Sequence, residues 1–499
     1  MAFSYLRPEN LSELATAARD AMQPYFDARK EAKRIAENKP KDNIPKGLPR
    51  VTDGTISAFV SSTPRAIIQQ IPTGEVDSLD EDKDAAGISE IILSEEILPN
   101  ANSTGTPIQK SWNAMRLALT YGSQPAYVFF KHDGNYLGAD FKLVDIRDVW
   151  LEPGKPYDKD CNYKFLRSWY QPSDIEKIKN QAKKDRLAGE SSPWNLEVLE
   201  MLEEKTKDND DDISSSKGFG IIFGFQKGVG MKIYGFDLDS GEIVYEKINP
   251  DPTGAIPIVS LYADIDMVDP LGRSPILPVI GHQNMLDAEM QMYQFAQAMG
   301  LAPPIIKQGS YSSSTLRMEP NAIWDLGAGN NNSASILNVN TTALNNFSNN
   351  YSLIKTQIMN HVNLQDSSVS AAVGNIGYSK THAGVEQQQQ RLNINNNQLL
   401  KNFESWFGDI CEIMLNLHFA LNHGETTIKL TEQYIKRKKL QDPDFDADTA
   451  KVEFDKIERG FKFNVSASTS KVKDDKDSID KLENLLRLSV EYPVLQSVY

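Results

Sequence analysis

Residues 274–304 read SPILPVIGHQNMLDAEMQMYQFAQAMGLAPP, and this stretch decides the fold of the chain. Ser274 supplies an N-cap oxygen, and Pro275 suits the first helical position because its missing N–H is not needed there. The helical pattern ends at Gly300, and Pro303-Pro304 prevents its continuation. The sequence therefore predicts a helix of about 26 residues, a rod of roughly 39 Å. Its apolar residues cover more than one stripe, which favours a helix that packs on two sides.

A second long helix is predicted after a short polar insert. Residues 301–341 are rich in turn formers, with Gly327-Ala328-Gly329 and Asn330-Asn331-Asn332. After a threonine cap at 341–342, apolar side chains recur at spacings of three and four and form a single stripe. These side chains are Leu344, Phe347, Tyr351, Ile354, Ile358 and Val362. Two long helices are therefore expected to flank one small, irregular insert.

A loop and a third helix follow this pair. Residues 366–380 carry mostly small, uncharged side chains, and we expect a flexible loop there. Thr381 then opens a helix that runs to about His423, roughly 63 Å long. The first half of this helix is rich in Gln and Asn, and its second half carries the large apolar residues. Beyond it, the sequence predicts a strand at 461–469 and a terminal helix at 476–490.

The first half of the chain mixes helical and strand patterns. A helix is predicted at 10–38, kinked at Pro24, and a linker rich in breakers at 39–50. Another helix is predicted at 110–121, with Gly122 as its C-cap. Short strands, several of them in hairpins, are predicted at 125–131, 138–144, 163–170, 218–226, 230–236 and 242–248. Together these patterns predict an α+β fold.

The composition is that of a folded soluble protein. Of 499 residues, 40% are hydrophobic and 24% are charged, and no apolar run is long enough to cross a bilayer. The first residues lack the basic start and apolar stretch of a signal peptide. The net charge of −15 argues against a simple grip on nucleic acid, since phosphate binding needs clustered cations. Acidic subunits could surround DNA without holding it, although solubility alone is the simpler reason for such a charge.

No motif in the sequence points to catalysis. The chain contains no P-loop, no dinucleotide-binding GxGxxG, no HExxH and no GxSxG. We therefore expect no catalytic residues, no cofactor and no metal. The six histidines lack metal-ligand spacing and are expected to be structural or exposed. Cys161 and Cys411 lie far apart, and buried, reduced thiols are expected for both.

A first carboxylate cluster leaves an alternative open. Asp264, Asp266 and Asp269 could serve a metal-dependent nucleic-acid enzyme. The favoured interpretation is an exposed turn before Pro270, because no basic substrate site accompanies the cluster.

A second acidic segment partly matches a calcium-binding loop. Ala447 stands where that loop needs glycine, and Pro443 stands at its second position, so a solvated acidic loop is favoured over calcium. The acidic residues that match the template are Asp442, Asp444, Asp446, Asp448 and Glu453.

The order of the predicted elements resembles the portal proteins, or head-tail connectors, of tailed bacteriophages. In that order an α+β region leads to helix, insert, helix, flexible loop and very long helix. Three local phrases are similar as well: LTYGSQPAYV at 119–128, VDIRDVWLEP at 144–153 and DPLGRSP at 269–275. The resemblance covers about residues 50–425. About 75 residues of this sequence follow the long helix, so the resemblance leads us to expect a small crown and not a large one.

The resemblance implies an elongated subunit with an α/β wing, a two-helix stem, a small clip insert, a flexible tunnel loop and a long wing helix. The corresponding segments are an N-terminal arm at 1–50, the wing at 51–270, the first stem helix at 271–300, the clip at 301–341, the second stem helix at 342–365, the tunnel loop at 366–381, the long wing helix at 382–424, and a C-terminal wing part or small crown at 425–499.

The resemblance also implies a function without enzymatic chemistry. Such proteins form a ring, of twelve subunits in the family, at one vertex of the capsid in the virion, after assembly in the host cytoplasm. Double-stranded DNA passes through the ring during packaging and ejection, without sequence-specific contacts. The implied partners are the large terminase, which carries the ATPase, the head-tail adaptor, the major capsid protein and a scaffold protein. No membrane is involved.

Site residues can be placed on this scheme. Met292 and Phe295 of the first stem helix are expected at the subunit interface, because the stem carries more apolar surface than one helix pair can bury. Within the clip, Arg317 and Trp324 are expected to contact terminase and adaptor, since Arg and Trp are favoured anchors.

Two further residues belong to the tunnel loop. Tyr378 and Lys380 are expected to face the DNA, with a brief phosphate contact from Lys380 that is weak and screened by salt. The simpler alternative is that Lys380 only caps the next helix or is solvated.

Two other classes of protein remain as alternatives. One is the metal-dependent nucleic-acid enzyme built on the 264–269 carboxylates, and the other is a scaffold or adaptor protein of a different kind. The size of the oligomer separates these possibilities.

Overall fold

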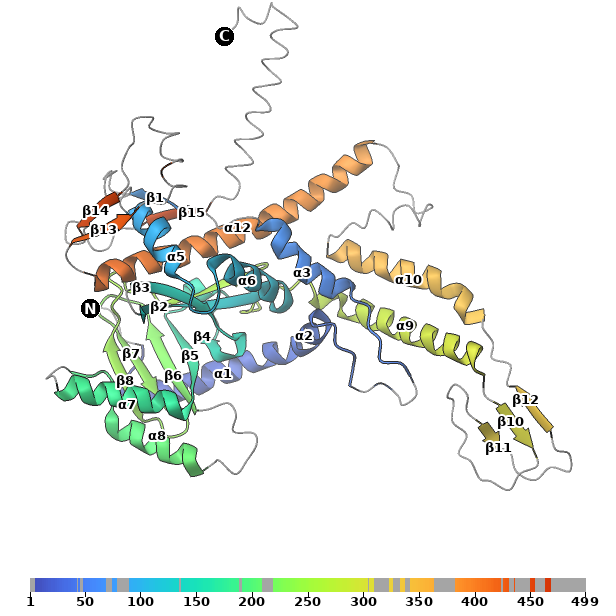
Figure 1. Ribbon diagram of the computed structural model, residues 1–499, viewed down its shortest axis with the longest axis horizontal. Coiled ribbons are helices and arrows are strands. Elements are labelled where there is room, and N and C mark those ends of the chain that lie inside the picture. The colour runs from blue at the N-terminus through green and yellow to red at the C-terminus, as the bar shows by residue number, and fades with distance from the viewer. Residues whose placement is uncertain are drawn as a thin grey trace, which may run out of the picture.

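The computed structural model describes residues 5–42, 44, 48–68, 74–78, 89–133, 136–187, 191–208, 219–303, 305–308, 323–325, 333–336, 342–362, 382–422, 425–429, 435, 449–453 and 463–467. Helices and mainly antiparallel sheets make up this part of the chain, so the mixed α+β class is confirmed. An α+β body carries a pair of helices that projects to one side (Figure 1).

The helices are α1 (Leu11–Ala28), α2 (Lys30–Ala36), α3 (Thr55–Ile67), α5 (Leu98–Asn100), α6 (Pro107–Tyr121), α7 (Pro172–Leu187), α8 (Leu196–Asp208), α9 (Ile280–Leu301), α10 (Thr342–His361) and α12 (His382–Leu421). Shorter turns of helix are η1 (Pro8–Asn10), the π-helical η2 (Ile92–Ile97), η3 (Ile146–Asp148), η4 (Asp158–Asp160) and η6 (Leu277–Val279).

The strands are β1 (Gly74–Ser78), β2 (Ser123–Asp133), β3 (Tyr136–Leu143), β4 (Val149–Leu151), β5 (Tyr163–Tyr170), β6 (Phe219–Gln226), β7 (Lys232–Phe236), β8 (Ile243–Ile248), β9 (Ile258–Tyr262), β10 (Ile305–Gln308), β11 (Ile323–Asp325), β12 (Ser333–Ile336), β13 (Glu425–Lys429), β14 (Thr449–Glu453) and β15 (Phe463–Ala467). Each of the predicted strands is confirmed within a few residues of its expected ends.

Two antiparallel sheets form the body. One has the order β4-β5-β6-β7-β8, and the other has the order β3-β2-β9. The long helix α12 crosses the body against the smaller sheet (Figure 1). Phe141 of β3 meets Trp406 and Phe407 of α12 edge-on, with ring centroids 6.3 and 6.5 Å apart. The apolar second half of this helix is therefore part of the core, as its sequence pattern predicts.

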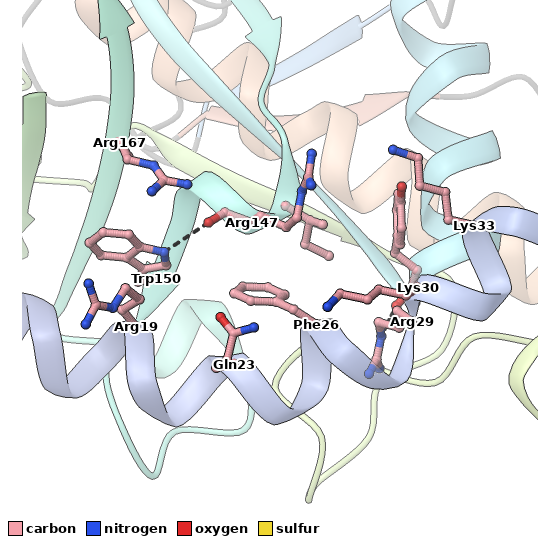
Figure 2. Close-up of a pocket in the computed structure, with 11 residues that line it drawn as sticks. Arg19, Gln23, Phe26, Arg29, Lys30, Lys33, Arg147, Trp150 and Arg167 are labelled. Atoms are coloured by element: carbon pink, nitrogen blue, oxygen red, sulfur yellow. Dashed lines mark hydrogen bonds between the residues drawn. The ribbon is translucent and has the colours of Figure 1, made fainter. Parts of the chain in front are cut away.

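The N-terminal helices belong to the body. α1 buries the apolar face that includes Leu11, Met22 and Phe26 against the five-stranded sheet. The predicted helix at 10–38 is divided into α1 and α2 at Arg29, and Pro24 lies inside α1 as predicted. A pocket remains between α1 and the region around β4 (Figure 2).

The predicted start of the helix after Ser274 needs a correction. The Ser274 hydroxyl does accept a hydrogen bond from the Ile276 N–H (3.1 Å), and it also donates to the Leu119 carbonyl (2.8 Å). However, the first turn is the 3₁₀ segment η6, and α9 begins only at Ile280. Pro278 lies in that turn and cannot donate the backbone hydrogen bond of an α-helix there. The other end of α9, at Leu301, lies where the sequence predicts it.

The insert between the two long helices contains a small three-stranded sheet, in the order β11-β10-β12. Strands β10 and β12 pair antiparallel, whereas β10 and β11 pair parallel. This sheet lies at the far end of the helix pair from the body (Figure 1). The C-terminal strand β15 returns to pair with β1 near α12. The predicted helix at 476–490 lies outside the described residues.

Candidate functional site: the projecting helical hairpin and its base

Helices α9 and α10 pack against each other as a hairpin that leaves the body (Figure 1). Tyr293 of α9 stacks on Phe347 of α10 with ring centroids 4.0 Å apart. Closer to the body, the Tyr351 hydroxyl donates a hydrogen bond to the Asp53 carboxylate (2.9 Å). These contacts thus stabilise the hairpin both along its length and where it joins the body.

The hairpin exposes large apolar side chains that the helix pair does not cover. Met292, predicted to lie at a subunit interface, is 58% exposed, and Phe295 on the same helix is half-buried. Met285, Leu301 and Leu353 are also exposed on the two helices. Unpartnered apolar side chains gathered on one projecting element are typical of a protein interface.

A buried polar cluster joins the first turns of α9 to the segment just before α3. The Gln283 side-chain amide donates to the Asp53 carbonyl and to the Asp287 carboxylate, both at 2.9 Å. The Asp53 N–H donates to the same carboxylate (2.9 Å). Burial raises the pKa of Asp287, while these hydrogen bonds and Arg34 oppose the rise. The cluster fixes the position of the hairpin relative to the body.

These residues were not among the site residues predicted from the sequence, although their spacing is visible there. Gln283, Asp287 and Gln291 recur every four residues, so they lie as a polar stripe on one face of the helix. The structure buries all three, and Gln291 donates to the Val51 carbonyl (3.0 Å).

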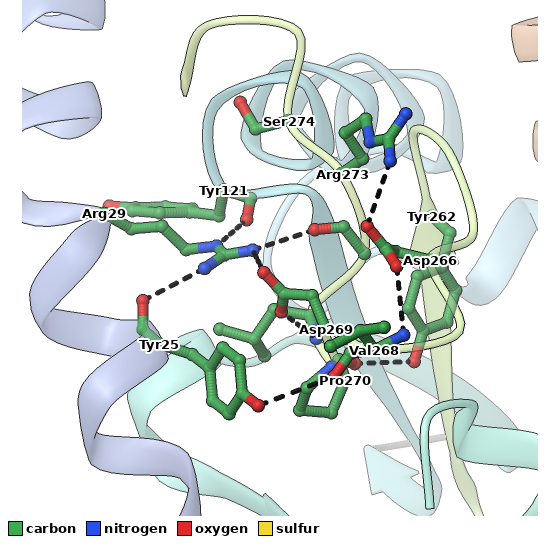
Figure 3. A network of polar contacts seen from close by, with 12 residues as sticks. Tyr25, Arg29, Tyr121, Tyr262, Asp266, Val268, Asp269, Pro270, Arg273 and Ser274 are labelled. Carbon is green, nitrogen blue, oxygen red and sulfur yellow. Dashed lines mark hydrogen bonds and ion pairs between the residues drawn. The ribbon is translucent and has the colours of Figure 1, made fainter. Parts of the chain in front are cut away.

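Below the hairpin, the Arg29 side chain ties three segments together (Figure 3). Its guanidinium donates to the Gly272 carbonyl (2.8 Å), to the Asp269 carboxylate (2.6 Å) and to the Tyr121 carbonyl. A further bond reaches the Tyr25 carbonyl of α1 (3.1 Å). The end of α1 is therefore joined to the turn after α6 and to the loop that leads into α9.

Glycine is required where these segments meet. Gly122 has φ +99°, and a Cβ atom there would lie 2.5 Å from the Leu271 and Gly272 carbonyl oxygens. Only a residue without a side chain permits this close approach. The predicted C-cap at Gly122 therefore has a second role, which is to admit the loop that leads into the hairpin.

Two of the three carboxylates at 264–269, those of Asp266 and Asp269, bind within this same loop or at its ends. Asp266 accepts from the Val268 N–H (2.9 Å) and from Arg273 (3.4 Å), and these contacts lower the pKa of Asp266. Asp269 accepts from the Leu271 N–H (2.9 Å) as well as from Arg29. Both carboxylates thus have structural partners. In the described parts of the chain, no three His, Cys, Asp or Glu residues are placed to hold a metal ion.

Several predicted site residues cannot be located. Arg317, Tyr378 and Lys380 lie outside the described residues. Trp324 is in β11, where its backbone pairs with Ile306, but its side chain is not described. Of the calcium-like segment, only 449–453 is described, as strand β14 paired with β13. The other acidic positions of that segment, 442–448, lie outside the described residues.

The two cysteines and three of the histidines pack against other parts of the protein. Cys161 and Cys411 are buried free thiols, as predicted, and burial raises the pKa of Cys161 to about 11. His418 is fully buried on α12, where burial lowers its pKa to about 4, so its imidazole is neutral at pH 7. His282 and His361 face each other between α9 and α10, with ring centroids 5.7 Å apart.

None of the described helices combines the length and apolar character that a membrane span requires. Comparison with models of protein families gave no match, and comparison with curated proteins gave none either.

Proposed function

We propose that this protein is one subunit of a ring-shaped portal, a channel for double-stranded DNA at one vertex of a phage capsid. The observation that carries the proposal is the projecting α9–α10 hairpin with its exposed apolar side chains. In a closed ring, the hairpin of each subunit would pack against the hairpins of its neighbours, and the exposed methionines would be buried. The order of the elements supports the same proposal, since an α+β body, helix, insert, helix and long helix follow one another.

In this proposal each part has a mechanical role. The hairpins are the stem that lines the channel, and the small sheet β11-β10-β12 is the core of the clip, where terminase and adaptor would dock through Arg317 and Trp324. The segment 366–381 would reach the duplex as a tunnel loop, with Tyr378 and Lys380 toward the DNA. The capsid protein and a scaffold protein would contact the wing.

The charge of the chain suits a passive channel. Each subunit carries a net charge of −15, so a ring of them repels the phosphate backbone from its wall. A single weak cation per subunit would then touch the duplex without holding it, because such contacts are screened by salt. A tight grip would oppose the motor, which we assign to the terminase and not to this protein. We propose no catalytic activity and no cofactor.

The geometry does not favour the alternative of a metal-dependent nucleic-acid enzyme. Asp266 pairs with Arg273, and Asp269 pairs with Arg29, so both carboxylates are part of a structural turn. The alternative of a scaffold or adaptor protein of another kind does not require a ring built on the α9–α10 hairpins, and the following experiment tests that requirement.

Replacing both Met292 and Phe295 with Asp should convert rings into monomers. Two carboxylates per subunit would have to be buried without partners at each neighbour contact, which costs several kcal/mol per charge. Mass photometry of the purified protein measures the change. Met285→Asp with Met292→Asp should act in the same way, and since both side chains are exposed, this variant tests assembly without disturbing the fold.

The matched control is Leu187→Asp, which changes an 89% exposed leucine at the end of α7 on the body. Rings should persist in that variant. Rings of unchanged size in both hairpin variants would show that the stem assignment is wrong.

A further inference from the structure

The loop between β9 and the first turn of the hairpin exposes a group of apolar side chains. Met267 and Val268 are 78% and 79% exposed, and Ile265 is 45% exposed. In the described parts of the chain, this is the one place where three exposed large apolar side chains fall within four consecutive residues. Single exposed apolar side chains are ordinary on a protein surface, but a group of them indicates a surface that contacts a partner.

Hydrogen bonds beneath these side chains tie the loop to α1 and β9 (Figure 3). Asp266 accepts from the Val268 N–H (2.9 Å), and the Tyr25 hydroxyl of α1 donates to the Val268 carbonyl (3.4 Å). The Tyr262 hydroxyl of β9 donates to the Pro270 carbonyl (3.2 Å). The backbone of the apolar tip is therefore ordered before any partner binds, and this preorganisation lowers the entropy cost of association.

The charges beside the apolar tip are largely compensated. Asp266 pairs with Arg273 (3.4 Å), and Asp269 pairs with Arg29 (2.6 Å), while Asp264 is exposed at the edge of the loop. Two copies of a chain with a net charge of −15 repel each other, so they meet closely only where acidic groups are neutralised or absent. Charged residues are also depleted from the centres of protein interfaces, which have polar rims. The loop therefore suits a contact with a second copy of this acidic chain.

A closed ring requires such a surface in addition to the hairpin. Each subunit of a ring presents two different faces, one toward each neighbour, because a head-to-tail contact joins unlike patches. The hairpin exposes Met285 and Met292, and the loop at 264–269 leads through η6 into the same hairpin. The apolar surface of the loop is thus continuous in the chain with the proposed contact surface of the stem.

We propose that the loop at 264–269 packs against the neighbouring copy of this chain in the ring, with Ile265, Met267 and Val268 buried in the contact. This inference rests on the proposed portal function and adds a contact made by the body to the contacts made by the hairpins. Since Arg29 fixes the loop to the end of α1, the contact joins the body of one subunit to the next subunit.

Photo-crosslinking of the purified full-length protein identifies the occupant of this surface. With p-benzoylphenylalanine in place of Met267, irradiation should give covalent multimers of this chain, from dimers upward. The matched control carries the same group in place of Leu187, which is 89% exposed at the end of α7. Irradiation of the control should leave monomers on a denaturing gel.

A charged loop should weaken assembly. Met267→Asp with Val268→Asp should lower the fraction of chains in rings at least about tenfold at fixed protein concentration, because carboxylates without partners would be buried at each contact. Mass photometry measures this fraction. Both side chains are exposed, so the fold of the subunit should not change. The matched control is Leu187→Asp with Val229→Asp, which adds the same charge at two other exposed positions of the body and should leave the rings intact.

Two results would overturn this inference and leave the hairpin contact standing. One is an unchanged fraction of rings in the loop variant, and the other is the absence of crosslinked multimers from position 267 in intact rings. Crosslinks that form only after capsid protein is added would likewise assign the loop to that partner and not to a second copy. A lack of rings in the unchanged protein is a different result, because it would refute the proposed portal function and this inference with it.

Discussion

Replacing Lys110 with Met should lower the free energy of unfolding by about 3–5 kcal/mol, the largest effect that we expect from a single substitution. The Lys110 ammonium is 2% exposed, and it donates to the Asp140 carboxylate (2.7 Å) and to the Ala101 and Phe141 carbonyls (2.9 and 2.6 Å). Burial lowers the pKa of Lys110, and the adjacent Asp140 opposes the shift. Without this ammonium, a fully buried carboxylate has no opposite charge.

Chemical denaturation at fixed protein concentration measures this effect. Lys131→Met is the control, because Lys131 on neighbouring β2 is only half-buried, and its loss should cost less than about 1 kcal/mol. Adding Asp140→Asn to Lys110→Met should recover part of the stability, since the uncompensated charge is removed. The recovery should be partial also because the native carboxylate accepts from the Ser103 and Phe141 N–H groups through different oxygens, and the single amide oxygen can replace only one of these. A loss below about 1 kcal/mol for Lys110→Met would contradict this account of the buried pair.

Replacing Arg29 with Ala should cost about 3 kcal/mol or more, and the damage should reach the base of the hairpin. The side chain is 2% exposed and bonds to three carbonyl groups and to Asp269. Its removal leaves these acceptors without their donor and frees the loop before α9. Arg29→Lys should restore only part of the stability, because an ammonium cannot reproduce the planar fork of the guanidinium.

Arg19→Ala provides the comparison within the same helix. Arg19 is partly exposed and pairs only with its neighbour Asp20, so its loss should cost less than about 1 kcal/mol. Hydrogen exchange should show faster opening of 269–280 in the Arg29 variants, while exchange in the five-stranded sheet stays slow. Equal losses for Arg19→Ala and Arg29→Ala would mean that the network in Figure 3 does not hold the hairpin base.

The elements with strong local patterns could be predicted from the sequence. Strand β5 lies at the predicted residues, because 163–170 alternates and is rich in aromatic side chains. The long helix α12 has nearly its predicted ends, since its apolar residues recur at helical spacing over many turns. The apolar stripe predicted for α10 is confirmed where Ile354 and Ile358 are buried.

Elements with weak patterns were missed. Helix α7 buries only Ile175 and Ala182, so the charged span around it shows little periodicity. Strand β1 pairs with residues 463–467, and no local signal predicts a partner so distant in sequence. For the same reason, sequence patterns could place Met292 on a helix but could not show that Arg29 would hold the loop before that helix.

Imaging of the purified protein by electron microscopy tests the central claim most directly, because a portal subunit must close into a ring. At micromolar concentration, class averages should show rings with a central opening, in which the α9–α10 hairpins of neighbouring subunits lie against one another. Single particles or compact dimers without an opening, at every concentration and salt condition tested, would contradict the account and favour a scaffold or adaptor of another kind.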